Sequence, residues 1–100
     1  MTTDIERLRR FRVMRRRYLR KGRRTFRGAE WKLYLAELDA VKFWISGLHD
    51  PMYDVAYYYW IRVLPDFAIA QRIFYSERQV RRIRRRIIAL DLQRCWTGAR

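Results

Sequence analysis

The sequence is poor in the residues that build cross-links and metal sites. Its 100 residues include one cysteine, Cys95, and one histidine, His49. A single cysteine cannot form an internal disulfide, which suits a reducing cytosol. One histidine and one distant cysteine cannot supply the ligands of a zinc site. We therefore expect no metal, and we expect His49, beside Asp50 and Pro51, to be a loop or cap residue.

Sequence patterns of catalysis and nucleotide binding are missing as well. The four glycines are isolated, so they form no glycine-rich phosphate loop. Cys95 has no neighbouring base that would activate it as a nucleophile. The acidic residues are scattered along the chain, and no two of them stand out as an acid–base pair. We therefore expect a protein that is not an enzyme and that carries no cofactor.

Long apolar runs are also missing. The longest is "VAYYYWI", Val55 to Ile61, far short of the roughly 20 residues that cross a bilayer. The N-terminus is polar and basic, without the apolar core of a signal peptide. These features predict a soluble intracellular protein that does not insert into a membrane.

Negative charge is scarce. The chain has 24 Lys and Arg against 10 Asp and Glu, a formal net charge of +14, and all but Lys21, Lys32 and Lys42 of the basic residues are arginine. A charge of this size attracts polyanions, and the planar guanidinium binds phosphate and guanine bidentately. Nucleic acid is thus the expected partner, ahead of an anionic membrane surface or an acidic protein.

The charge is divided along the chain. Residues 1–28 hold 12 basic and two acidic residues, residues 29–66 hold three and six, and residues 67–100 hold nine and two. Half of the chain is apolar, which is enough for one core at this length. We therefore expect a basic N-terminal arm, 1–28, made of a helix and a loop. It would precede a helical domain over 29–100.

Helical periodicity covers most of the sequence. Residues 3–20 carry a narrow apolar stripe behind a Thr3–Glu6 capping box. Residues 29–46 follow, with one apolar face before Gly47. Asp50 and Pro51 would cap and open a third helix. The expected stripe of the first helix is Ile5, Leu8, Phe11, Met14 or Arg15, and Tyr18 or Leu19. The expected apolar positions of the second are Trp31, Tyr34, Leu35, Leu38, Val41 and Ile45, and those of the third are Met52, Val55, Ala56, Tyr59 and Trp60. No stretch alternates with period two, so we predict an all-α fold of about five helices.

The aromatic run "YYYW", Tyr57 to Trp60, has two interpretations. Tyr59 and Trp60 continue the apolar face, which favours a place in the core. Stacking on the bases of a single strand is the alternative. We expect Tyr57 and Tyr58 to be the exposed members of the run.

The C-terminal region predicts a helix-turn-helix over 65–92. A short helix opens at Pro65 and ends near Ile73, and the turn "FYS" leads to Ser76, which would cap the next helix with Gln79. At about 100° per residue, one side of that helix is apolar and the opposite side is arginine. Val80, Ile83, Ile87 and Leu90 make the apolar side, and Arg78, Arg82 and Arg85 lie opposite. Many such turns have a glycine of positive φ where this chain has Phe74.

This pattern predicts a recognition helix, 76–92, in the major groove of DNA. Early residues of such a helix reach base edges and later ones meet phosphates. We expect base contacts from Glu77, Arg78 and Arg82, backbone contacts from Arg81, Arg85 and Arg86, a further contact from Gln79, and phosphate contacts from Arg15, Arg16, Arg23 and Arg24. Arg84 lies beside the apolar stripe, so we expect it to pair with Asp54 or Asp66.

The N-terminal basic helix has three interpretations: a DNA-wrapping arm, a surface that docks on RNA polymerase or RNA, and a helix that lies on anionic lipid.

Residues Gly47 to Leu92 resemble the RinA/ArpU-like phage transcriptional regulators, which are similar to region 4 of bacterial sigma factors. The resemblance rests on Leu48-Asp50-Pro51, Tyr57 to Ile61, Ile69-Ala70, Tyr75-Ser76 and Val80-Ile83-Ile87-Leu90. It implies a DNA-binding regulator of phage genes that acts with host RNA polymerase in the host cytoplasm, at the nucleoid. A polymerase- or RNA-binding protein with little sequence readout is the alternative. Homodimers are also considered, since helix-turn-helix proteins often pair and the apolar stripe of the first helix offers a surface.

Overall fold

The computed structural model describes residues 4–92 and the side chains of residues 5–89. Five α-helices and three short helical segments make up this part of the chain, and it contains no strand. The α-helices are α1 (Asp4–Lys21), α2 (Gly28–Ser46), α3 (Met52–Ala56), α4 (Asp66–Ile73) and α5 (Glu77–Arg86). The short segments are the 3₁₀ turn η1 (Arg23–Thr25) and the π-helical segments η2 (Tyr57–Ile61) and η3 (Ile87–Leu92), which extend α3 and α5. The predicted all-α fold is confirmed.

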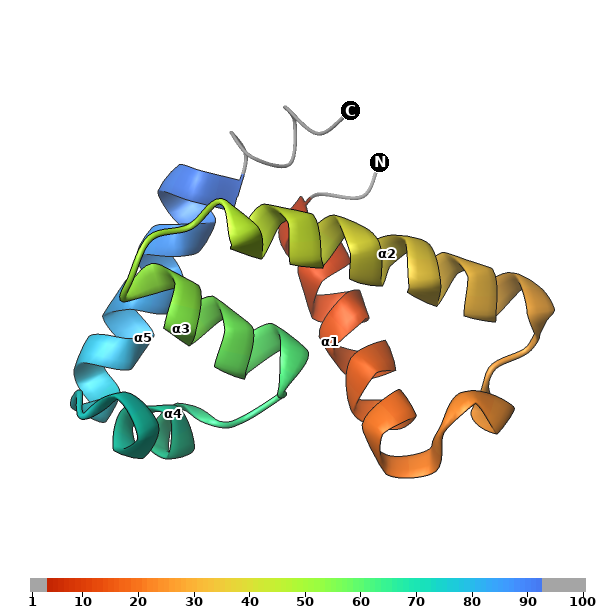
Figure 1. Cartoon of the computed structure of the whole chain (residues 1–100), viewed down its shortest axis with the longest axis horizontal. Helices are drawn as coiled ribbons and strands as arrows, with labels where there is room; N and C mark the ends of the chain where they lie inside the picture. The colour runs from red at the N-terminus through yellow and green to blue at the C-terminus, as the bar shows by residue number, and fades with distance from the viewer. Residues whose placement is uncertain (1–3, 93–100) are drawn as a thin grey trace.

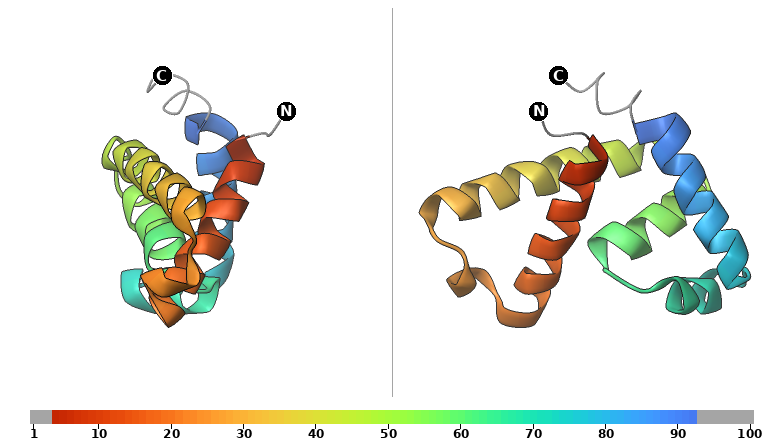
Figure 2. Two further views of the ribbon diagram at one scale, coloured as in Figure 1. Left: turned by 90° about the vertical axis from the view of Figure 1, so that its right-hand side faces the viewer. Right: turned by 180° about the vertical axis from the view of Figure 1, so that it is seen from behind.

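The α3–η2 segment lies at the centre of the molecule. It contacts α1 and α2 on one side and α4 and α5 on the other. In Figure 1, α1 and α5 flank α3, and α2 runs along the edge above them. The views in Figure 2 show the same arrangement, with α1 and α5 both near the viewer when the molecule is seen from behind. The two most basic helices thus stand on either side of one shared central helix.

The core draws apolar side chains from all five α-helices. α1 buries Leu8, Phe11 and Met14, and the large aromatic residue of the central segment, Trp60, packs edge-on against Trp44 at 5.3 Å between ring centroids. The other buried apolar side chains are Phe26, Tyr34, Val41, Ile45, Leu48, Val55, Ala56, Ile61, Ile69, Ala70, Val80 and Ile87. The expected separation of a basic arm at residue 28 is therefore wrong as a description of packing, because α1 is part of this core. Leu8, Phe11 and Met14 of its apolar stripe are covered by this core, whereas Ile5 at the start of the helix is exposed. The covered positions are not a free surface for a homodimer.

Several local predictions need correction. Asp50 does not cap α3: Pro51 occupies the cap position, no side chain caps this helix, and the Asp50–Pro51 peptide is cis. Leu35 is exposed, and Glu37 is buried on the inner face of α2. Arg7 of α1 donates to Glu37 at 2.8 Å, which compensates the buried carboxylate.

Two further predictions concern side chains outside the described residues, and another concerns how exposed two tyrosines are. The Thr3 cap lies outside the described residues, as does the Leu90 side chain. Tyr57 and Tyr58 are half-buried and packed against the core, so they are less exposed than expected.

The connection between α4 and α5 follows the sequence closely. α4 begins directly after Pro65 and ends at Ile73, as predicted. Phe74 then adopts a left-handed conformation (φ 60°, ψ 38°), the positive φ that a glycine usually supplies at this position. Ser76 caps α5 through a complete capping box with Gln79: the Ser76 hydroxyl accepts from the Gln79 N–H at 3.1 Å, and the Gln79 Oε1 accepts from the Ser76 N–H at 2.8 Å. This box fixes where α5 starts and which residues face outward.

Candidate nucleic-acid interface

The outer face of α5 carries a row of exposed arginines. Val80 and Ile87 have no exposed surface, and they fix the inner side of the helix. On the opposite side, Arg78, Arg82, Arg85 and Arg86 are exposed, and none of them forms an ion pair with another residue of the described chain. Within the described chain, these four side chains are the cations of α5 that no acidic residue neutralises. Their charge is available to an external anion.

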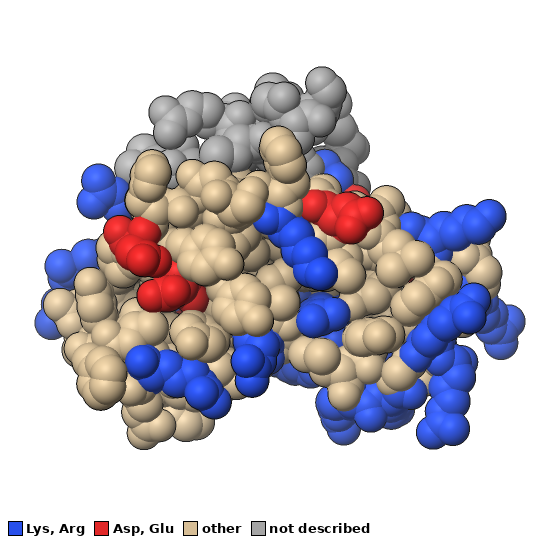
Figure 3. Space-filling view, viewed as in Figure 1, with Lys and Arg blue, Asp and Glu red and all other residues tan. Residues whose placement is uncertain are grey.

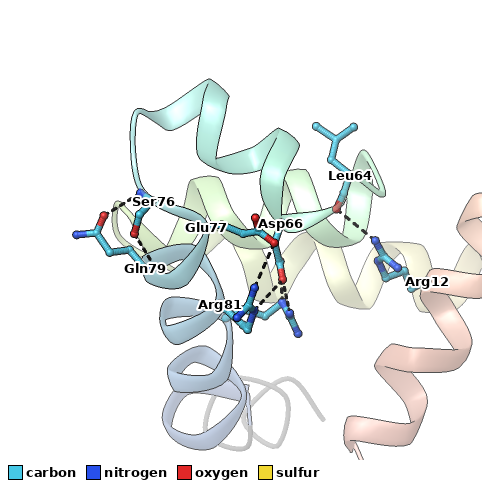
Figure 4. Close-up of polar contacts among 8 residues, drawn as sticks. Arg12, Leu64, Asp66, Ser76, Glu77, Gln79 and Arg81 are labelled. Carbon is cyan, nitrogen blue, oxygen red and sulfur yellow. Dashed lines mark hydrogen bonds and ion pairs between the residues drawn. The ribbon is translucent and has the colours of Figure 1, made fainter.

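The inner arginines of α5 are neutralised by the protein. Arg84 binds both carboxylate oxygens of Asp66, with Nη2–Oδ2 at 2.8 Å and Nε–Oδ1 at 3.3 Å. Arg81 lies 3.2 Å from Oε1 of Glu77 and 3.7 Å from Oδ2 of Asp66 (Figure 4). The expected partner of Arg84 is thus confirmed as Asp66 and not Asp54. Glu77 and Arg81, both expected to contact DNA, are engaged with each other.

Two arginines of α1 cap the C-terminal end of the central helix. The last carbonyl groups of a helix have no partner within it, and here arginine side chains supply the donors. Arg15 donates from Nε to the Ile61 carbonyl at 2.9 Å and from Nη1 to the Tyr34 hydroxyl at 2.8 Å. Arg12 donates from Nε to the Tyr59 carbonyl at 3.0 Å. Its Nη2 donates to the Leu64 carbonyl at 3.2 Å (Figure 4). Cations at this end also interact favourably with the helix dipole.

Arg15 was expected to contact phosphate, and the structure gives it this internal role instead. It is half-buried, and two of its nitrogens are committed to protein acceptors. Sequence reasoning missed the capping because the acceptors lie 46–52 residues further along the chain.

Tyr59 links the two basic helices. The Arg12 guanidinium lies 3.9 Å from the centre of its ring, and the Arg84 guanidinium lies 4.4 Å from the same centre. Such cation–π contacts are worth about 0.5–2 kcal/mol each, depending on desolvation. Because two guanidinium groups already occupy this ring, it is not free to stack on a base. The core interpretation of "YYYW" is thus favoured for Tyr59.

Burial lowers the pKa of Arg12. The loss of hydration is the largest cause, and repulsion from Arg16 and Arg84 acts in the same direction, while Tyr59 and Asp66 oppose it. The shift therefore reflects mainly the loss of hydration around this half-buried guanidinium, with a smaller contribution from its positive neighbours.

The remaining arginines predicted to contact phosphate do not all lie near α5. Arg16 is exposed on α1, on the side that faces α5. Arg23 and Arg24 are exposed in η1, at the opposite end of the long dimension from α5 (Figures 1 and 2). Arg23 lies 5.2 Å from the centre of the Trp31 ring. The predicted contact residues therefore form two surfaces: one on and beside α5, and one at η1.

Acidic side chains are found both beside α5, where Glu77 and Asp66 pair with its arginines, and elsewhere on the molecule. The face shown in Figure 3 is largely uncharged, with acidic side chains in two regions and basic side chains near its centre and along its edges. Asp54 lies on α3, and burial raises its pKa, with repulsion from Asp50 adding to the effect. The exposed arginines on and beside α5 and at η1 are therefore the places that attract an anionic partner.

Comparison with models of known families, with characterised proteins and with solved structures finds no match to this chain. Within residues 4–92, no group of three or more His, Cys, Asp and Glu residues could hold a metal ion. No helix in that range has both the length and the apolar character needed to cross a bilayer.

Proposed function

We propose that this chain binds duplex DNA through α5 and regulates transcription. The observation that carries the proposal is the set of four exposed arginines on the outer face of α5, which have no ion-pair partner in the described chain and lie opposite the fully buried Val80 and Ile87. The buried stripe holds the helix rigidly, so its charged face is presented in one orientation. A duplex places a phosphate charge every 1.7 Å along its axis, and α-helices fit its major groove.

The α4–α5 pair supports a helix-turn-helix interpretation. A helix of eight residues, Asp66–Ile73, is followed by a three-residue connection and then by the capped helix α5. Ala70 is small and buried where the two helices approach, and Phe74 supplies the left-handed turn. The resemblance to the RinA/ArpU-like regulators is the basis for proposing phage genes as the targets and the host cytoplasm as the location.

The contacts within α5 refine the proposed roles. Gln79 uses its Oε1 in the cap, and Arg81 is tethered to Glu77, so base readout falls mainly to Arg78 and Arg82. Arg85 and Arg86 come later in the helix and suit phosphates. Arg16 is kept as a phosphate contact beside α5, and Arg23 and Arg24 as contacts on a separate surface. Arg15 is withdrawn from the set because it caps the central helix.

Selection from a pool of random duplexes tests the proposal. The purified protein should enrich a motif without any other factor, and Arg82→Ala should relax it at one or two positions, because one arginine–guanine pair gives about 1–3 kcal/mol of discrimination. Arg85→Gln should leave the motif intact and reduce the slope of log affinity against log salt by about one contact. A protein that enriches no motif and shows no salt slope would contradict the proposal.

A second candidate function is binding to a protein partner such as RNA polymerase. The exposed aromatic residues Phe67 and Phe74 at α4 favour it, and Phe74 is 94% exposed although its left-handed backbone disfavours a large side chain. Phe74→Asn should relieve that strain and raise the stability of the protein by about 0.5–1 kcal/mol. If the polymerase is the partner, the protein should co-purify with it in the absence of DNA, and this variant should lose that association. Unchanged co-purification would exclude Phe74 from the contact.

A further inference from the structure

A cleft of about 310 Å³ opens between α1, η2 and the C-terminal part of the α5–η3 segment. Arg9, Arg12 and Arg16 line it from α1, where their spacing of three and four residues places them on one helix face. Arg84 lines it from α5, and Tyr59 from the central segment. No lining residue from the described chain is acidic. The cleft therefore brings four guanidinium groups together from two helices.

The four arginines divide into two fixed and two free groups. Arg12 and Arg84 are held by hydrogen bonds to protein acceptors and by the Tyr59 ring between them. Arg9 and Arg16 are exposed, and neither forms an ion pair within the described chain. Among the described residues, the carboxylate that pairs with an arginine of the cleft is that of Asp66, and both of its oxygens already bind Arg84. The cleft thus holds more positive charge than the described side chains neutralise.

We propose that this cleft is a phosphate-binding site that takes a backbone phosphate of the nucleic acid contacted by α5. The backbone assignment rests on the proposed function. A tetrahedral phosphate accepts hydrogen bonds from several guanidinium groups at once. A phosphate that contacts the fixed Arg12 and Arg84 can therefore also be bound by Arg9 and Arg16. Two phosphate sources share this chemistry, the nucleic-acid backbone and a free phosphorylated small molecule.

Position favours the backbone. Arg84 and Ile88 line the cleft, and Arg85, next to Arg84 in the chain, is exposed on the outer face of the same helix. A strand that passes over Arg85 therefore reaches the mouth of the cleft. Ile5 and Val13 are exposed apolar side chains on its rim, and they suit the apolar face of a sugar. Phosphate beside sugar is the repeating unit of a nucleic-acid backbone.

The test compares two double variants that remove the same charge. Arg9→Gln/Arg16→Gln alters the cleft, and Arg10→Gln/Arg20→Gln alters exposed arginines of α1 that do not line it. All four side chains are exposed, so both variants should fold, which circular dichroism checks. The cleft variant should lose about tenfold more affinity for a duplex than the control, since it removes two local phosphate contacts. Inorganic pyrophosphate should shift the NMR signals of Arg12 and Arg84 in the wild type and in the control, and not in the cleft variant.

The outcomes separate the cleft from the proposed function. Equal affinity losses in both variants, with no pyrophosphate shift in the wild type, would overturn the cleft and leave α5 as the DNA-binding element. Pyrophosphate shifts that depend on Arg9 and Arg16, with equal duplex affinities, would overturn the backbone assignment in favour of a free phosphorylated ligand. A wild type that binds pyrophosphate and no duplex would contradict the proposed function while supporting the site.

Discussion

Helices α1 and α5 are both rich in arginine, and they use it in different ways. In α1, Arg7, Arg12, Arg15 and Arg17 contact acceptors or acids inside the described chain, while its other four arginines are exposed. In α5, only Arg81 and Arg84 do so, and the four arginines of its outer face have no partner there. Basic composition alone therefore does not mark an interface. The useful distinction is whether a guanidinium already has its acceptors within the fold.

The largest expected effect is a loss of duplex affinity with little change in the stability of the fold. Replacing Arg78, Arg82 and Arg85 together with glutamine should lower duplex affinity by about 100-fold or more, because these contacts combine base reading with phosphate neutralisation. The free energy of unfolding should stay within about 0.5 kcal/mol of the wild type, because all three side chains are exposed. Fluorescence anisotropy with a labelled duplex and urea unfolding measure the two quantities. A large loss of stability with intact affinity would reverse the roles assigned to α5.

Arg15→Met should show the opposite behaviour in α1. It removes the donors to the Ile61 carbonyl and the Tyr34 hydroxyl, and hydrogen bonds to a charged group contribute about 1.5–3 kcal/mol each when their loss leaves a partner unsatisfied. We expect about 2 kcal/mol less stability in urea unfolding. Arg10→Met is the matched control, since Arg10 is exposed on the same helix, and it should change stability little. Equal values for the two variants would remove Arg15 from its capping role.

Asp66→Asn tests the ion pair that anchors α5. The substitution leaves Arg84 without its bidentate carboxylate and weakens the contact with Arg81. Because Asp66 is largely buried and Arg84 is partly buried, we expect a loss of about 1 kcal/mol, reduced by added salt. Glu77→Gln is the control for an exposed pair on the same helix, and it should cost at most about 0.5 kcal/mol. Similar losses for both variants would mean that Asp66 has no special role.

The smallest expected effect concerns the partly exposed pair Arg17–Glu30, which joins α1 to α2 with Nη2 and Oε2 2.8 Å apart. The hydrogen bond from Arg17 lowers the pKa of Glu30. A carboxyl group with a lowered pKa in the folded state stabilises the fold above its ordinary pKa, and this contribution disappears as the pH falls through the folded-state value. Glu30→Gln should therefore lower the thermal midpoint slightly between pH 6 and 8. The difference should vanish in acid, once the pH lies well below the ordinary glutamate pKa of about 4.3. A difference that persists in acid would have another cause.

The sequence predicted the elements with strong local patterns. The α4–α5 connection and the Ser76–Gln79 capping box follow from residues close in the chain. Helical periodicity placed Arg84 beside the apolar stripe and left Asp54 and Asp66 as its two possible partners, of which the structure shows Asp66. The left-handed conformation of Phe74 was not predicted, because a glycine is usual at that position. The same patterns did not predict contacts between segments that lie far apart in the sequence. Nothing in the N-terminal sequence indicates that Arg12 and Arg15 meet carbonyls 46–52 residues away. The apolar stripe of α1 was visible, but its burial depended on a partner helix that periodicity does not identify.

The most direct test of the account is to follow the arginine Nε–H signals by NMR as duplex DNA is added. Each signal reports the surroundings of one guanidinium, so the two basic helices are compared in a single sample. The account predicts that the signals of Arg78, Arg82 and Arg85 shift as the duplex binds, while that of Arg15 stays in place because its Nε remains bonded to the Ile61 carbonyl. Shifts confined to α1 and η1, with the outer face of α5 unchanged, would contradict it.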